Sequence, residues 1–268
     1  MFKTRLISGI ILVILAGYLL VKGGNLLFLV SALVSMVGLY ELYRVMKIEK
    51  RLPGMLGGVA LLAYYGLLWT GQEQYMMFLF VTFLMLLMTV YVITFPKFGT
   101  EQITVAFFGL FYVGVMFSYV YQVRCMPDGE FLVWLILLSS WGCDTCAYCV
   151  GMLLGKHKLA PVLSPKKSVE GAIGGVAGAA LLGFIFGTIF DQKMGFILHA
   201  ELISAAACAI GAVISQIGDL AASAIKRNHD IKDYGHLIPG HGGILVRFDS
   251  MIFTAPAIYY AVLFLAHL

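Results

Sequence analysis

The strongest constraint on this chain is its series of apolar stretches, each long enough to cross a membrane as one helix. A spanning helix needs about 20 mostly apolar residues, and about nine segments of the chain meet that length. They lie near residues 5–22, 25–46, 53–71, 75–95, 103–124, 131–154, 171–190, 196–225 and 248–267. We therefore expect an all-α, polytopic integral membrane protein with about nine transmembrane helices.

The composition excludes the main alternatives to a membrane protein. Apolar residues make up 61% of the 268 residues and charged residues only 12%, against roughly 45–50% and about 25% in soluble domains. No soluble domain has enough polar surface to enclose this much apolar material, and a disordered chain would be far less apolar. Five cysteines, sparse and odd in number, do not form the framework of a secreted disulfide scaffold.

The basic residues predict the orientation of the spans. If the N-terminus lies in the cytoplasm, fifteen lysines and arginines fall in inside stretches, and only Lys22, Arg124 and Lys193 fall outside. This asymmetry is the one that cytoplasmic loops of membrane proteins show. We expect a cytoplasmic N-terminus and a C-terminus on the opposite side.

The polar residues are distributed unevenly between the two halves of the chain. Residues 1–125 carry almost no ionisable group inside their apolar segments, whereas residues 140–250 hold nearly all of the polar residues. We predict an N-terminal transmembrane scaffold over 1–125 and a catalytic transmembrane half over 126–268. In the second half we expect a polar cavity that opens to the cytoplasm.

Charged side chains near or inside apolar segments mark the candidate site, because such groups are costly in a membrane and usually functional. Asp144 lies near the end of the sixth segment. Asp219, Ser223, Lys226 and Arg227 are spaced to share one face of a helix, where they could bind a metal and a phosphate together. The alternatives are a carboxylate that reaches interfacial water and a solvated helix end with an internal ion pair.

Two loops add groups suited to phosphate. Ser164-Pro-Lys-Lys-Ser168 precedes the seventh segment; we expect Ser168 to cap that helix, with Lys166 and Lys167 beside its anion-attracting N-terminus. Gly240, His241, Gly242 and Gly243 form a loop whose backbone N–H groups can approach an anion, although such a sequence is also typical of a simple turn. We predict that the two lysines and the 226–247 cluster line one site.

The cysteines and the remaining histidines are weaker candidates for a metal site. Cys143, Cys146 and Cys149 are regularly spaced, but they lie in an apolar helix without a fourth ligand. We expect them to be small buried core residues. We expect His199, His229, His236 and His267 to lie at the surface or the membrane interface.

Several motifs of the C-terminal half resemble one enzyme family. Ser223-Ala-Ile-Lys-Arg227, Lys232-Asp233, Ile238-Pro-Gly-His-Gly-Gly243 and Arg247-Phe-Asp249 resemble the signature of the phosphatidate cytidylyltransferases, or CDP-diacylglycerol synthases. Asp144-Thr-x-Ala-Tyr148, Ser164-Pro-Lys-Lys-Ser-Val-Glu-Gly171 and Gly218-Asp-Leu220 are similar to that family's other landmarks. In size the chain resembles the bacterial branch.

The resemblance implies transfer of a cytidylyl group from CTP to phosphatidate, which gives CDP-diacylglycerol and pyrophosphate for phospholipid biosynthesis. It implies a multi-pass enzyme of the inner cell membrane, with its active site at the cytoplasmic face and no nucleic-acid partner, and it leaves a homodimer open. The implied catalytic groups are Asp219, Lys226, Arg227, Lys232, Asp233, His241, Arg247 and Asp249. The implied substrate-binding groups are Ser164, Lys166, Lys167, Ser223, Gly240, Gly242 and Gly243. Asp144, Asp219 and Asp249 would bind Mg²⁺, with room for a second, monovalent or divalent cation.

One position departs from the family pattern. The family has Asp-Arg-x-Asp where this chain has Val246-Arg247-Phe248-Asp249, so a hard oxygen ligand of the kind that Mg²⁺ needs is missing. Three interpretations remain open: an engineered inactive form, a degenerate paralogue, or an enzyme whose remaining carboxylates suffice.

Two other functions compete with this interpretation. A membrane transporter would also have many spans and intramembrane carboxylates, but the polar groups gather at one face and no inverted repeat is visible. A catalytically inactive relative that only binds lipid or nucleotide is the second alternative, and Val246 supports it.

Overall fold

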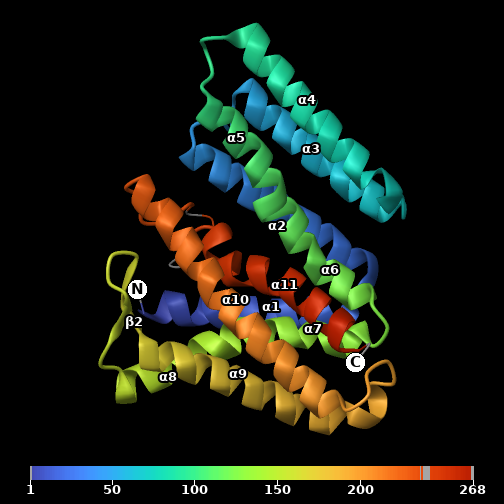
Figure 1. Cartoon of the computed structure of the whole chain (residues 1–268), viewed down its shortest axis with the longest axis vertical. Helices are drawn as coiled ribbons and strands as arrows, with labels where there is room; N and C mark the ends of the chain where they lie inside the picture. The colour runs from blue at the N-terminus through green and yellow to red at the C-terminus, as the bar shows by residue number, and fades with distance from the viewer. Residues whose placement is uncertain (1, 236, 238–241, 267–268) are drawn as a thin grey trace.

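The computed structural model describes residues 2–235, 237 and 242–266, with side chains from residue 9 onward, and it is built almost entirely of long helices (Figure 1). The α-helices are α1 (Phe2–Lys22), α2 (Gly24–Val45), α3 (Leu52–Trp69), α4 (Met76–Thr94), α5 (Thr100–Gly109), α6 (Met116–Cys125), α7 (Gly129–Leu137), α8 (Cys143–Leu154), α9 (Val169–Phe190), α10 (Ala200–Asn228) and α11 (Leu245–Leu265). Short 3-10 turns, η1 (Glu73–Tyr75) and η4 (Asp191–Lys193), lie at the start of α4 and the end of α9.

Each predicted apolar segment coincides with one of these helical runs, so the all-α membrane fold is confirmed. Among the described residues, eight helical runs are long and apolar enough to cross a membrane. The apolar part of α1 that is described, Gly9–Lys22, is shorter than a typical span. The total of nine spans therefore stays a prediction.

Two of the predicted segments are interrupted by π-helical turns. η2 (Leu110–Val115) joins α5 to α6, and η3 (Leu138–Gly142) joins α7 to α8. A π-helical turn within an α-helix frequently marks a functional site, because the extra residue shifts the face on which later side chains lie. Here η3 ends two residues before Asp144.

A short hairpin, which the sequence analysis did not predict, lies between α8 and α9. β1 (Lys158–Ala160) pairs antiparallel with β2 (Ser164–Ser168). The side chain of Ser168 accepts a hydrogen bond from the Gly171 backbone N–H at 3.1 Å, so the predicted cap of α9 is confirmed. Glu170 accepts hydrogen bonds from the backbone N–H groups of Lys156 and His157, at 3.0 and 3.2 Å, and thereby ties the start of the hairpin to α9.

The C-terminal half is held together by close helix packing. α10 packs between α9 and α11, and α8 packs against α9 (Figure 1). The buried face of α9 carries a small residue at every fourth position: Gly171, Gly175, Ala179, Gly183 and Gly187. Small residues let backbones approach closely where no hydrophobic effect drives helices together, as in a bilayer.

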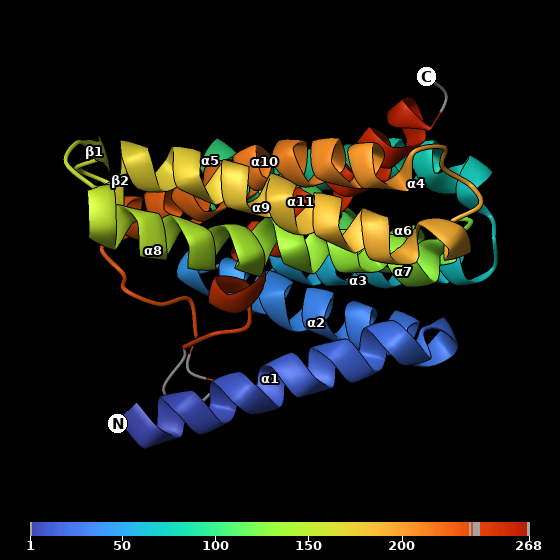
Figure 2. The same cartoon turned by 90° about the horizontal axis from the view of Figure 1, so that it is seen from below.

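The N-terminal half is joined by buried polar pairs as well as by apolar packing. The hydroxyl of Tyr64 lies 2.8 Å from that of Ser118, and the hydroxyl of Tyr43 donates to the Ala106 carbonyl at 2.5 Å. α1 lies along one side of the helical bundle, where it contacts α2 and α7 (Figure 2). The division of the chain into a scaffold half and a catalytic half stays a prediction.

The cysteine prediction is only partly correct. Cys143 is buried, with its thiol 3.8 Å from the Ala212 carbonyl oxygen. Cys146 is half-buried and Cys149 is exposed, so the expectation of three buried residues is wrong for these two. Cys143 and Cys146 lie beside Gly175 and Gly178 of α9, whereas Cys149, six positions after Cys143, is rotated to another side of the helix.

The packing of α9 on α10 predicts the effect of a single methyl group. In Gly183→Ala the new Cβ would lie 2.5 Å from the Ser204 carbonyl oxygen and 2.8 Å from the Cys208 Cβ. We expect a loss of about 1–3 kcal/mol in the free energy of unfolding, since overpacking forces the backbones apart. The midpoint of thermal unfolding in detergent measures the change.

Gly66→Ala is the matched control, because Gly66 also lies in a helix but has no neighbour within 4 Å of an added Cβ. Its unfolding midpoint should stay the same or rise slightly, as the alanine restricts the unfolded chain. Equal decreases in the two variants would contradict the proposed close packing of α9 on α10.

Candidate active site

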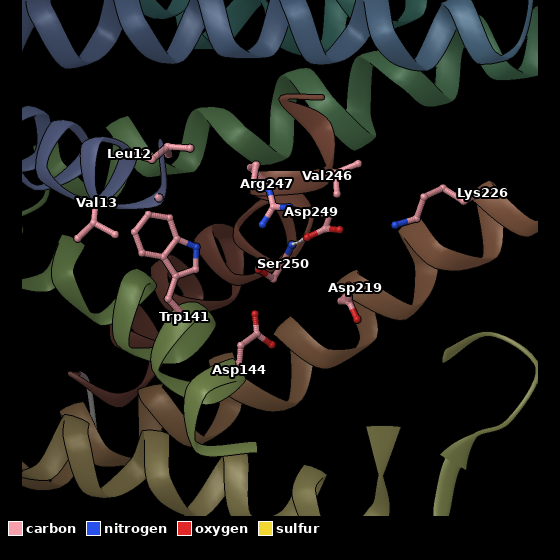
Figure 3. A pocket seen from close by; sticks show the side chains of 11 residues that line it. Leu12, Val13, Trp141, Asp144, Asp219, Lys226, Val246, Arg247, Asp249 and Ser250 are labelled. Carbon is pink, nitrogen blue, oxygen red and sulfur yellow. Dashed lines mark hydrogen bonds between the residues drawn. The ribbon is translucent and has the colours of Figure 1, made fainter. Parts of the chain in front are cut away.

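A polar cavity of about 400 Å³ opens where α10 and α11 meet α1, η3 and α8. It contains three carboxylates and two cationic side chains (Figure 3). The lining residues are Gly9, Leu12, Val13, Trp141, Asp144, Asp219, Lys226, Val246, Arg247, Asp249 and Ser250. The structure thus brings together five charged residues, the first and last of which, Asp144 and Asp249, lie more than 100 positions apart in the sequence.

Helix geometry explains how α10 contributes to this cavity. Asp219 and Lys226 are seven residues apart, which places them two turns apart on the same side of the helix. Both line the cavity, and Figure 3 shows the amine of Lys226 extending toward Asp249. α10 therefore supplies one carboxylate and one cation to the cavity.

Asp249 is the most buried of the three carboxylates, with only 6% of its surface exposed. Its Oδ1 accepts a hydrogen bond from the Ser250 backbone N–H at 2.8 Å, and its charge interacts with those of Asp219 and Lys226. A buried carboxylate is costly unless it is paired with cations or hydrogen-bond donors. The Ser250 N–H and the charge of Lys226 thus compensate part of the cost of burying this carboxylate.

Lys167 connects the hairpin to this cavity. Its Nζ lies 2.5 Å from the Asp219 carboxylate, and both side chains are about one-quarter exposed. A second cavity of about 320 Å³ adjoins the pair; it is lined by Asp144, Ala147, Tyr148, Gly151, Met152, Leu159, Lys166, Lys167, Ser168, Gly171, Ala172 and Gln216. Asp144 lines both cavities, so the lysines of β2 and the carboxylates of α8 and α10 form one continuous polar region.

Other predicted residues are not part of this region as the structure describes it. Neither cavity is lined by Ser164, Ser223, Arg227, Lys232 or Asp233, and Arg227 and Lys232 are exposed. Gly240 and His241 lie outside the described residues. Roles for all of these residues in the reaction stay predictions.

The described glycines of the predicted phosphate loop face carboxylates. An added Cβ on Gly242, whose φ is +84°, would lie 2.9 Å from Asp233 Oδ1. A Cβ on Gly243 would lie 2.6 Å from Glu41 Oε1. These two glycines allow carboxylates to approach the backbone closely, which the sequence analysis did not foresee.

Glu41 and Arg44 of α2 are site neighbours that sequence reasoning missed. Glu41 is 4% exposed, and its carboxylate accepts a hydrogen bond from the Leu245 backbone N–H at the start of α11. Arg44 donates a hydrogen bond to the Tyr234 carbonyl oxygen at 2.6 Å. A signal was present, because Glu41 is the only acidic residue in the second apolar segment and such a charge is a functional candidate.

The neighbouring Tyr234 hydroxyl donates to the Ala222 carbonyl oxygen at 2.9 Å. Burial raises the pKa of Tyr234 far above its ordinary value, with smaller effects of Tyr112 and Asp249.

The donor set of the cavity fits a magnesium ion that substrate helps to bind. Among the described residues, no three carboxylate, histidine or cysteine side chains are grouped closely enough to hold a metal by themselves. Mg²⁺ commonly takes only one or two protein carboxylates and completes its shell with water and substrate phosphates. Asp219 and Asp249, which face one cavity and interact electrostatically, have this chemistry.

Val246 places an apolar side chain in the wall of this cavity. It is half-buried, lies three residues before Asp249 in the first turn of α11 and packs against the apolar core. Figure 3 shows it above the carboxylate of Asp249. An oxygen ligand at this position would therefore face the same space as the carboxylates.

Comparison with known proteins gives a consistent result over almost the whole chain. Residues 3–265 match the model of the cytidylyltransferase family. The phosphatidate cytidylyltransferase of Bacillus subtilis is 35% identical over 96% of this chain and 96% of its own length. The phosphatidate cytidylyltransferase of Staphylococcus saprophyticus is 32% identical over 95% of this chain and 96% of its own length. The chain therefore belongs to the cytidylyltransferase family.

Proposed function

We propose that the protein transfers the cytidylyl group of CTP to phosphatidate and releases CDP-diacylglycerol and pyrophosphate. The observation that carries this proposal is the meeting of three carboxylates with Lys167, Lys226 and Arg247 in one polar region, in a chain of this family. The phosphatidate cytidylyltransferases named above support the choice of substrates.

The cations in this region counter the main barrier to the reaction, which is the repulsion between two anionic substrates. Two anions, the phosphate of phosphatidate and the triphosphate of CTP, must come within bonding distance of each other. Fixed cations lower that repulsion and stabilise the charge that develops on the phosphoryl oxygens. Lys166 and Lys167 are suited to one phosphate group, and Lys226 and Arg247 are suited to another.

The bond changes require little proton transfer. An oxygen of the lipid phosphate attacks the α-phosphorus of CTP, and the bond from that phosphorus to the bridging oxygen of the β-phosphate breaks. Because the phosphate of phosphatidate is already ionised at neutral pH, no general base is needed. The residues of the cavity therefore act by binding and aligning two anions.

A magnesium ion held by Asp219 and Asp249, with Asp144 nearby, completes the proposal. When bound, Mg²⁺ neutralises phosphate charge and orients the reacting groups. Asp219 is already paired with Lys167, so this lysine can move to a substrate phosphate when the carboxylate gains another cation. The cavity also leaves room for a second, monovalent or divalent cation.

We place the reaction at the cytoplasmic face of the inner cell membrane. CTP is dissolved in the cytosol and phosphatidate lies in the bilayer, so the site must be reached from both. The apolar helices and the basic residues of the hairpin and of the C-terminal end of α10 support this placement. A homodimer remains compatible with the proposal.

The transporter alternative is not favoured. An alternating-access transporter binds its substrate near the middle of the membrane, whereas this polar region includes the hairpin and the end of α8 beside it. Val246 supports the other alternative, a catalytically inactive protein that only binds lipid or nucleotide. The Val246→Asp prediction below distinguishes it from an active enzyme.

The first prediction from the proposed function concerns topology. Single cysteines introduced as Lys158→Cys and Asp230→Cys, in a chain whose native cysteines are replaced by serine or alanine, should react with an impermeant thiol reagent only from the cytoplasmic side. Lys193→Cys should react only from the other side. All three positions are exposed. Labelling of positions 158 and 193 from the same side would contradict the placement.

The second prediction concerns the contact between the hairpin and α10. Lys167→Gln should lower kcat/KM for CTP and phosphatidate by roughly 10- to 100-fold, because a hydrogen bond to a charged group contributes about 1.5–3 kcal/mol. Lys158→Gln is the matched control on the same hairpin, with an exposed side chain. An equal effect of the two substitutions would show that the Lys167–Asp219 contact is not part of the site.

The third prediction concerns Val246. Val246→Asp should raise the rate of CTP-dependent pyrophosphate release by about 10² or more and increase its dependence on Mg²⁺, because a metal ligand contributes several kcal/mol to the transition state. Without Mg²⁺ the added carboxylate should lower the unfolding midpoint through repulsion from Asp249, and Mg²⁺ should restore it.

The unfolding measurement is independent of turnover and serves as the control. Val246→Asn, which adds no charge, should respond to Mg²⁺ no more than the parent chain does. If Val246→Asp changes neither the rate nor the effect of Mg²⁺ on unfolding, position 246 does not contribute to metal binding.

A further inference from the structure

The carboxylate of Glu41 binds the start of a helix that lies about 200 positions further along the chain. Its Oε1 accepts the Ile244 backbone N–H at 3.1 Å, and its Oε2 accepts the Leu245 N–H at 2.9 Å. Glu41 itself belongs to α2, in the N-terminal half, and is almost fully buried. The contact therefore joins the two halves of the molecule at the beginning of α11.

The chemistry of this contact is that of a helix cap. The first N–H groups of a helix have no partner within the helix, and the helix dipole makes this end attractive to anions. A cap usually comes from the residue just before the helix, but Ile244 in that position has no polar side chain. Glu41 supplies the missing acceptors with both of its oxygens.

Glycines on both sides make room for the carboxylate. A Cβ on Gly235 or on Gly243 would collide with the side chain of Glu41. One turn further along α2, Arg44 donates to the Tyr234 carbonyl oxygen. α2 thus fixes the chain at position 234 and again at 244–245, just before the residues that line the cavity.

We propose that Glu41 is a positioning residue, which holds the N-terminus of α11 so that Arg247 and Asp249 face Asp219 and Lys226. The inference rests on the proposed function above. Arg247 and Asp249 lie two and four residues after Leu245, so a shift or rotation of the first turn would move both side chains. Glu41 does not reach the cavity itself and acts only through α11.

A second consequence concerns the substrate phosphates. Because Glu41 occupies the N–H groups of Ile244 and Leu245, those two groups are not available to an anion from the substrate. The phosphates are then bound by the cations of the cavity and by the region around Lys166 and Lys167.

The test compares Glu41→Gln with Glu101→Gln. Glutamine has nearly the same shape, but its amide nitrogen cannot accept an N–H, so one of the two backbone groups loses its partner. Glu101 is another glutamate near a helix N-terminus, in the first turn of α5, but its side chain is exposed. Hydrogen exchange of a peptide covering residues 242–250, followed by mass spectrometry, reports on the start of α11 without any need for activity.

We expect exchange of the 242–250 peptide to be at least tenfold faster in Glu41→Gln, with α9 unchanged and Glu101→Gln like the parent chain. Kinetics, measured in the parent and in the Val246→Asp background, should show kcat at least tenfold lower. KM for the substrate whose phosphate binds at Lys166 and Lys167 should change less than threefold, because these lysines do not depend on α11.

Each outcome decides the matter. Unchanged exchange would show that Glu41 does not hold α11, and faster exchange with unchanged kcat would reduce it to a structural cap; both overturn the inference. No activity in either background would refute the proposed function, while exchange would still report on the contact. If Glu41→Gln fails to fold, Gly235→Ala is the second variant, because its added Cβ would displace the Glu41 carboxylate. It should give the same faster exchange and lower kcat.

Discussion

The need to neutralise three clustered carboxylates, of which Asp249 is buried, organises the C-terminal half of this protein. Asp144, Asp219 and Asp249 meet within an apolar membrane protein, where unpaired charges are costly. Lys167 is brought to them by a hairpin, and Lys226 by the helix that carries Asp219. Such a cluster of carboxylates and cations would be costly in a structural core. A reaction between two anionic substrates requires it.

The surrounding helices hold these side chains in place. Small residues on α9 let α8, α9 and α10 pack closely, so that Asp144 and Asp219 are held by neighbouring backbones. The start of α11 is held from the opposite side by Glu41. The cavity is thus enclosed by two sets of helices that the sequence separates widely, and the N-terminal half contributes directly to its shape.

Much of the fold could be predicted from the sequence, because hydropathy and length alone define membrane helices. The cap by Ser168 and the shared face of Asp219 and Lys226 were also predictable, since both follow from local helix geometry. The hairpin and the partner of Lys167 were not, because they depend on contacts between distant segments. Glu41 was overlooked because a single carboxylate in an apolar segment shows no partner until the helices are placed.

The central claim, that this polar region transfers a cytidylyl group to a lipid phosphate, is tested most directly by following the phosphorus atoms of CTP. The purified protein and its Val246→Asp variant would be incubated with phosphatidate, Mg²⁺ and CTP radiolabelled at either the α- or the γ-phosphorus. The account predicts that label from the α-position enters the lipid and that label from the γ-position is released as pyrophosphate. Label from the γ-position in the lipid, or no label in the lipid from either position in both proteins, would contradict it.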